Sequence, residues 1–123
     1  NQTHGGHHIG HMNHRAPVAG FGQRRKTPAP DQRRHAFEIL AAQEYNDQIP
    51  AGIPRQAGAV VAHKTGSISK VQHDAAVVRL PDGREYVLVL LATDFGASEE
   101  GRKRVIETTR KMSRAVWEAM IAP

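Results

Sequence analysis

The chain contains an almost uninterrupted apolar run, Tyr-Val-Leu-Val-Leu-Leu at residues 86–91, which limits the folds that are open to it. Aromatic and β-branched residues favour a strand, and the run is far shorter than the about 20 apolar residues of a membrane span. A strand with one face exposed to solvent alternates apolar and polar residues, and this run does not alternate in that way. It therefore predicts a strand that is covered on both faces and has a neighbour on each side.

Two further strands are expected before this run, at residues 59–64 and 74–80, joined by a hairpin-like link. Pro-Asp-Gly at 81–83 supplies a tight turn into the third strand, 84–92. The three strands should be antiparallel neighbours. Since the third would then be an edge with an exposed apolar rim, we expect a further strand beside it.

Helical patterns lie on both sides of these strands. Asp31 is the expected cap of a helix ending near Asn46, with apolar residues at helical spacing: Phe37, Leu40, Ala41 and Tyr45. Two prolines in residues 49–54 predict an extended or turning connector, because the residue before a proline is pushed out of the α region.

Ser98 is the expected cap of the last helix, with Glu99 and Glu100 favourably placed in its first turn. Its apolar stripe comprises Val105, Ile106, Thr109, Met112, Val116, Trp117 and Met120, which leaves the basic residues on a solvated face. The predicted fold class is α+β: an antiparallel three-stranded sheet flanked by an upstream helix and a C-terminal helix.

Residues 1–30 are rich in Gly, His, Pro and Arg, and we expect them to be irregular or disordered, with the domain at 31–123. The spacing of five histidines could place several imidazoles on one helical face: His4, His7, His8, His11 and His14. Neighbouring glycines disfavour a helix and the tract has no carboxylate, so adventitious metal affinity is expected rather than a functional metal site. No cofactor is expected.

The chain has a net charge of +5, one Trp, two Tyr and three Phe, and no Cys. Few aromatic residues are present to stack on bases, so nucleic acid is not an expected partner. Without Cys there is neither a disulfide nor a thiolate metal site, and the redox compartment stays open. The N-terminus lacks the apolar stretch of a secretory signal, so the export route also stays open. The sequence leaves the oligomeric state open as well.

The stretch 60–67, Val-Val-Ala-His-Lys-Thr-Gly-Ser, and the following residues 73–78 resemble the Lys-Thr-Gly strand and the next strand of class A-like serine β-lactamases. The resemblance covers residues 31–121. It implies the C-terminal part of a serine hydrolase of the penicillin-binding-protein-like superfamily, periplasmic or secreted in bacteria. It also implies that the three strands are part of a larger five-stranded sheet.

The resemblance also implies a substrate-binding role for Lys64, Thr65, Gly66 and Ser67. The ammonium of Lys64 and the hydroxyl of Thr65 would hold a carboxylate, and Gly66 would let substrate approach the backbone. The backbone N–H of Ser67 would form one arm of an oxyanion hole, and the N–H of the nucleophilic serine the other. The alternative is that Lys64 is an exposed strand-end lysine and residues 65–67 form a turn.

The remaining family motifs are not found. The one Ser-x-x-Lys, residues 67–70, overlaps the strand end and is taken as coincidence; no Ser-Asp-Asn occurs, so no nucleophile is identified. His73 and Asp74 are adjacent on a strand and should point to opposite faces, which favours a structural role over a catalytic pair with Ser67 or Ser69. They also occupy the region where the family often has an arginine, which favours a divergent hydrolase.

The sequence therefore indicates the substrate-binding segment of an acyl-serine hydrolase for β-lactams or a related amide, inactive as this chain alone. A D-alanyl-D-alanine peptidase-type penicillin-binding domain fragment and a non-catalytic basic binding module are the alternatives.

Overall fold

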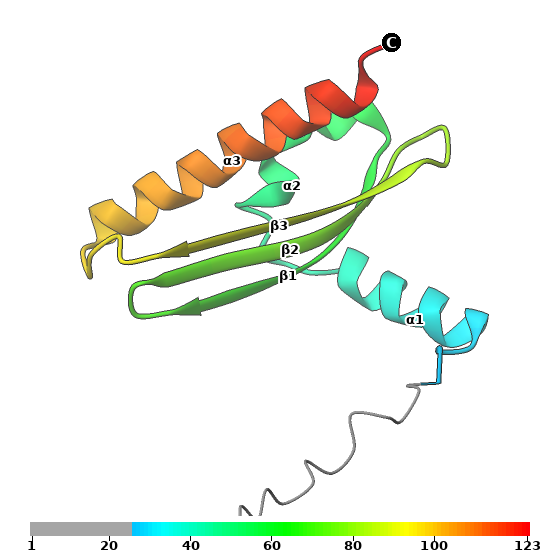
Figure 1. The fold of residues 1–123 in the computed structure, drawn as a ribbon, viewed down its shortest axis with the longest axis horizontal. Helices are drawn as coiled ribbons and strands as arrows, with labels where there is room; N and C mark the ends of the chain where they lie inside the picture. The colour runs from blue at the N-terminus through cyan, green and yellow to red at the C-terminus, as the bar shows by residue number, and fades with distance from the viewer. Residues whose placement is uncertain (1–25) are drawn as a thin grey trace, which may run out of the picture.

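The computed structural model describes residues 26–123, which form a three-stranded sheet with helices on both sides (Figure 1). The elements in chain order are α1 (Pro30–Ala41), α2 (Ile49–Gly52), a 3-10 turn (Arg55–Ala57), β1 (Val60–Ile68), β2 (Val71–Arg79), β3 (Glu85–Thr93) and α3 (Glu99–Ile121). The predicted α+β class, with an upstream helix and a C-terminal helix around an antiparallel sheet, is confirmed. The histidine tract and the rest of residues 1–25 lie outside the described residues, so the predicted domain boundary stays a prediction.

The sheet has the order β1-β2-β3, and both pairs are antiparallel, as predicted. The first two strands are longer than predicted and meet across only two residues, with Lys70 in the left-handed region at φ 62°. The second turn is where Pro-Asp-Gly predicts it: the N–H of Gly83 donates to the carbonyl of Leu80 over 3.0 Å, and Gly83 takes a φ of 88°. A positive φ of this kind is readily adopted by glycine.

Helix α1 differs from the prediction at both ends. Its N-cap is Ala29, whose N–H donates to the side chain of Gln32, and Asp31 lies in the first turn instead. The helix ends at Ala41 rather than near Asn46, because the side chain of Asn46 donates to the carbonyl of Gln43 and stabilises a turn there. Tyr45 consequently lies outside the helix and is exposed.

The proline-containing connector is only partly extended. Ile49–Gly52 forms one turn of α-helix, α2, which accommodates Pro50 because the first helical N–H groups have no partner within a helix. Ile53, which precedes Pro54, is extended as predicted, with φ −101° and ψ 130°.

Strand β3 has two unlike faces. Tyr86, Leu88 and Leu90 are half-buried on the side of α3, whereas Val87, Val89 and Leu91 are 70%, 51% and 71% exposed on the opposite side. The prediction that β3 is covered on both faces is therefore wrong for the part of the chain that the structure describes. On the open face, α1 packs only near the end of the sheet that contains Val60 and Arg79. In this part β3 pairs only with β2, so a further strand beside β3 stays a prediction.

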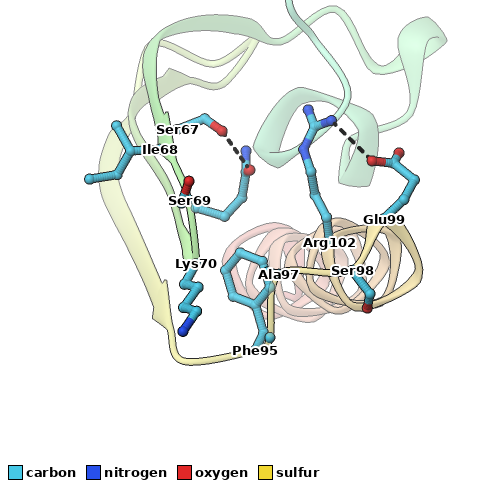
Figure 2. Close-up of a pocket in the computed structure, with 11 residues that line it drawn as sticks. Ser67, Ile68, Ser69, Lys70, Phe95, Ala97, Ser98, Glu99 and Arg102 are labelled. Atoms are coloured by element: carbon cyan, nitrogen blue, oxygen red, sulfur yellow. Dashed lines mark hydrogen bonds and ion pairs between the residues drawn. The ribbon is translucent and has the colours of Figure 1, made fainter.

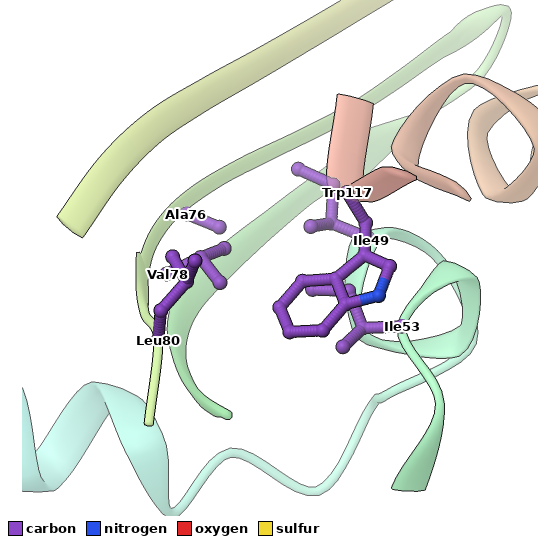
Figure 3. Close-up of a cluster of buried hydrophobic side chains, with 6 residues drawn as sticks. All are labelled: Ile49, Ile53, Ala76, Val78, Leu80 and Trp117. Carbon is purple, nitrogen blue, oxygen red and sulfur yellow. The ribbon is translucent and has the colours of Figure 1, made fainter. Parts of the chain in front are cut away.

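The core lies between α2, β2 and α3. Figure 3 shows the indole ring of Trp117 between the side chains of Val78 and Leu80 on one side and those of Ile49 and Ile53 on the other. The buried cluster consists of Ile49, Ile53, Ala76, Val78, Leu80 and Trp117. Helix α3 begins as predicted, with the hydroxyl of Ser98 accepting the N–H of Gly101. Met112 departs from the predicted stripe and is exposed, because it lies beside the free edge of β3 near Leu91. Among residues 26–123 no helix is long and apolar enough to cross a membrane.

Candidate functional site

The predicted substrate-binding residues all lie on β1, an outer strand of the described sheet. The strand continues to Ile68, so the alternative that residues 65–67 form a turn is wrong. Alternation places Lys64 and Gly66 on the open face and Thr65 and Ser67 on the face of α3. Because only β2 pairs with β1 here, the peptide groups along its other edge are free to bond an extended ligand.

Lys64 is exposed, and its Nζ donates only to the carbonyl of the next residue, Thr65, at 2.9 Å. In the described part of the chain it has no acidic partner within ion-pairing distance. The ammonium group is therefore free to bind an external carboxylate.

A buried histidine lies immediately before this lysine. Nδ1 of His63 lies 2.9 Å from Oδ1 of Asp74, and the two side chains are 1% and 0% exposed. His63 was not among the site residues predicted from the sequence, although the strand register offers a signal: Asp74 is opposite Thr65, so His63 is its diagonal neighbour on the same face.

His73 points to the other face, as predicted from strand alternation. Its Nδ1 accepts the N–H of Ala92 on β3 at 3.3 Å, and it makes no contact of this kind with Asp74. A catalytic pair formed by the two adjacent residues is therefore excluded by their positions.

In the part of the chain that the structure describes, no basic side chain is hydrogen-bonded to Ser67. Its hydroxyl donates to the side-chain oxygen of Gln72 over 3.1 Å. Figure 2 shows the side chain of Lys70 directed away from that hydroxyl, so the Ser-x-x-Lys at residues 67–70 is a hairpin end and not a nucleophile with its base.

The pocket in Figure 2 lies on the α3 side of this hairpin and has a volume of about 390 Å³. Its walls come from the hairpin and the start of α3, where Arg102 pairs with Glu99 at 3.9 Å. Lys64, Thr65 and Gly66 do not line it. No cluster of three metal-ligating side chains occurs among residues 26–123.

Among residues 26–123, two titrating groups have displaced pKa values, and both lie away from β1. Burial raises the pKa of the Tyr86 phenol, whose hydroxyl has no hydrogen-bond partner within the described part of the chain. The backbone N–H and the guanidinium of Arg84 lower the pKa of Asp82 in the β2–β3 turn. Neither group tunes the chemistry of Lys64.

The antiparallel sheet, the C-terminal helix on one face and Lys-Thr-Gly on an outer strand agree with the resemblance to β-lactamase-like serine hydrolases. Residues 23–120 match the family model described as the β-lactamase enzyme family, and the chain belongs to this family. The resemblance seen in the sequence is thereby confirmed. A comparison with curated protein sequences gives no significant match.

Solved structures show the same relationship. The structure described as PBP-A is 33% identical over 75% of this chain and 32% of its own, with a TM-score of 0.66. An ancestral class A β-lactamase (GNCA) is 26% identical over 74% of this chain and 34% of its own, with a TM-score of 0.63. A class A β-lactamase from Mycobacterium abscessus is 26% identical over 77% and 35%, with a TM-score of 0.64. The chain thus spans about a third of the length of these proteins.

Proposed function

We propose that β1 is the substrate-binding strand of a serine hydrolase that opens β-lactam rings through an acyl-serine intermediate, and that this chain alone is inactive. The observation that carries the proposal is the exposed Lys64 on an outer strand of a β-lactamase-family sheet. A variant of PBP-A, 33% identical to this chain, has been described as an acyl-enzyme complex with penicillin G.

The chemistry of the strand suits such a substrate. Lys64 offers a free cation to the carboxylate of the β-lactam, and Thr65 adds a hydroxyl from the other side of the strand. The free edge offers peptide groups to the substrate amide, and Gly66 has no side chain to block close approach. The N–H of Ser67 would stabilise the oxyanion that forms when the lactam carbonyl is attacked.

We assign the nucleophile to a serine that is not part of this chain, since residues 1–25 contain no serine. Ring opening needs a serine oxygen that attacks the carbonyl while a base takes its proton and the lactam C–N bond breaks. Three of the four serines that the structure describes have hydrogen-bonded hydroxyls: Ser67 donates to an amide, Ser98 caps α3, and Ser113 donates to a carbonyl. The fourth, Ser69, lies in the exposed turn between β1 and β2. The residues that the structure describes therefore bind substrate without cleaving it.

The alternative of a basic binding module receives less support from α3. Its basic residues are exposed, but three of them pair with glutamates on the same helix: Arg102 with Glu99, Arg104 with Glu100, and Lys111 with Glu107. This face is solvated and partly neutralised, which weakens any attraction for phosphate.

The first experiment measures catalysis directly. The chain is incubated with nitrocefin and benzylpenicillin, and turnover and intact mass are followed. We expect no hydrolysis and no penicilloyl adduct; a stable adduct on Ser67 would contradict the assignment of the nucleophile.

The second experiment measures binding. Benzylpenicillin at millimolar concentration is titrated while backbone amide signals are followed by NMR. We expect shifts at residues 64–67 that are lost in Lys64→Ala and kept in Lys70→Ala, an exposed lysine at the end of the same hairpin. Equal loss in both variants, or no shifts in the unmodified chain, would rule out the proposed strand function.

A further inference from the structure

A closed hydrogen-bond network surrounds the ring of His63. Its Nδ1 faces Oδ1 of Asp74 at 2.9 Å, and its Nε2 faces Oδ1 of Asn46 at 3.0 Å. The other carboxylate oxygen of Asp74 accepts the N–H of Ile49 at 3.0 Å. The network therefore joins β1 and β2 to Asn46, which follows α1, and to Ile49, the first residue of α2.

The orientation of the Asn46 amide is fixed by its own contacts. Its Nδ2 donates to the carbonyl of Gln43 at 2.8 Å and to that of Glu44 at 3.2 Å. Its oxygen is consequently the atom that faces His63, and an amide oxygen can only accept a hydrogen bond.

An ionised carboxylate can also only accept, so both ring nitrogens of His63 face acceptors when Asp74 is ionised. A neutral imidazole has one N–H and one lone pair, so it can satisfy only one of these two contacts. An imidazolium satisfies both, and Asp74, which also accepts a backbone N–H, is suited to be its ionised partner. Lys64, the next residue, lies on the opposite face of the sheet and adds no bond to the ring.

We propose that His63 is a buried, doubly protonated positioning residue that holds the strand segment of Lys64 and Thr65 in place. Its Nδ1–H donates to Asp74 on β2 and its Nε2–H donates to Asn46, so the ring holds β1 to both. The double protonation of His63 is inferred only from the hydrogen-bond geometry. The effect of His63 on ligand binding rests on the proposed function of β1.

The protonation state is tested by NMR of the chain labelled with ¹⁵N-histidine at neutral pH. For His63 we expect two protonated ring nitrogens with protons protected from water. His73 is an internal control, because its Nδ1 accepts the N–H of Ala92 and must carry no proton in that bond. One unprotonated nitrogen at His63 would overturn the proposal.

The positioning role is tested with Asn46→Ala, which removes one acceptor and leaves the Asp74 pair, and with His63→Gln. The control is His73→Gln on the open face. Amide hydrogen exchange at residues 64–67 should become about tenfold faster in the first two variants relative to the amides of β3. Unchanged exchange in folded Asn46→Ala would overturn the positioning role even if His63→Gln does not fold.

Benzylpenicillin titration then separates the two proposals. If the unmodified chain shows no shifts at residues 64–67, the proposed function fails, while the ring protonation and hydrogen exchange still decide the role of His63. If it does show shifts, Asn46→Ala should weaken them several-fold and His73→Gln should not.

Discussion

The hydroxyl of Ser113 in α3 donates a 2.8 Å hydrogen bond to the carbonyl oxygen of Ile49 in α2, and both residues are fully buried. Gly52 allows this approach. A Cβ atom at Gly52 would lie 2.6 Å from the carbonyl oxygen of Arg110 and 2.6 Å from Cβ of Ser113.

Gly52→Ala should therefore destabilise the fold by about 1–3 kcal/mol, because the crowded backbone of α3 has to move. Urea denaturation followed by the fluorescence of Trp117 measures the change. Ala51→Ser, at the exposed neighbouring position of α2, should stay within about 0.5 kcal/mol of the unmodified chain. A similar result for Gly52→Ala would mean that the two helices are less tightly packed than described.

Tyr86→Phe should leave stability at neutral pH unchanged or raise it by up to about 1 kcal/mol, because the buried hydroxyl has no partner. Burial raises the pKa of this phenol above 10.0, so the folded state holds the proton more firmly than the unfolded state. The stabilisation linked to this proton is complete below pH 10 and is lost as the pH rises through the folded pKa.

Denaturation between pH 8 and 11.5 tests this linkage. The alkaline loss of stability should become shallower in Tyr86→Phe and stay unchanged in Tyr45→Phe, where the phenol is exposed. Parallel curves for the unmodified chain and Tyr86→Phe would show that Tyr86 is not the group responsible.

If His63 is doubly protonated as proposed, Asp74→Asn should destabilise the fold by about 3–5 kcal/mol, because it leaves a buried cation without its anionic partner. Thermal unfolding followed by circular dichroism at pH 7 measures the loss. Asp47→Asn is the matched control, since Asp47 has no side-chain ion pair among the described contacts. Equal melting temperatures for the two variants would contradict a charged His63–Asp74 pair.

The open face of β3 should make the isolated chain self-associate at high concentration, because Val87, Val89 and Leu91 form an exposed apolar row. The double change Val89→Lys and Leu91→Lys should keep the chain monomeric in sedimentation velocity runs. Ile39→Lys adds a cation at an exposed apolar residue of α1 and should not have this effect. Association that persists in the double variant would locate the contact elsewhere.

The strand order, the Pro-Asp-Gly turn and the Ser98 cap could be predicted because each depends on residues close together in the sequence. The end of α1 and the helical turn at Ile49 could not, since a side-chain bond of Asn46 and the packing of Gly52 on α3 decide them. For the candidate site, the family resemblance pointed to Lys64 and its neighbours. His63 was missed because its partners, Asn46 and Asp74, become visible only once the register and the connector are known.

Ile49 is bound through both of its backbone groups, since its N–H donates to Asp74 in β2 and its carbonyl accepts from Ser113 in α3. Ile49 thus couples the sheet to the long helix. If either the sheet or α3 moves relative to Ile49, one of these two buried hydrogen bonds breaks. We therefore expect residues 46–117 to unfold as one cooperative unit, with the fluorescence of Trp117 and the hydrogen exchange of β2 reporting the same free energy.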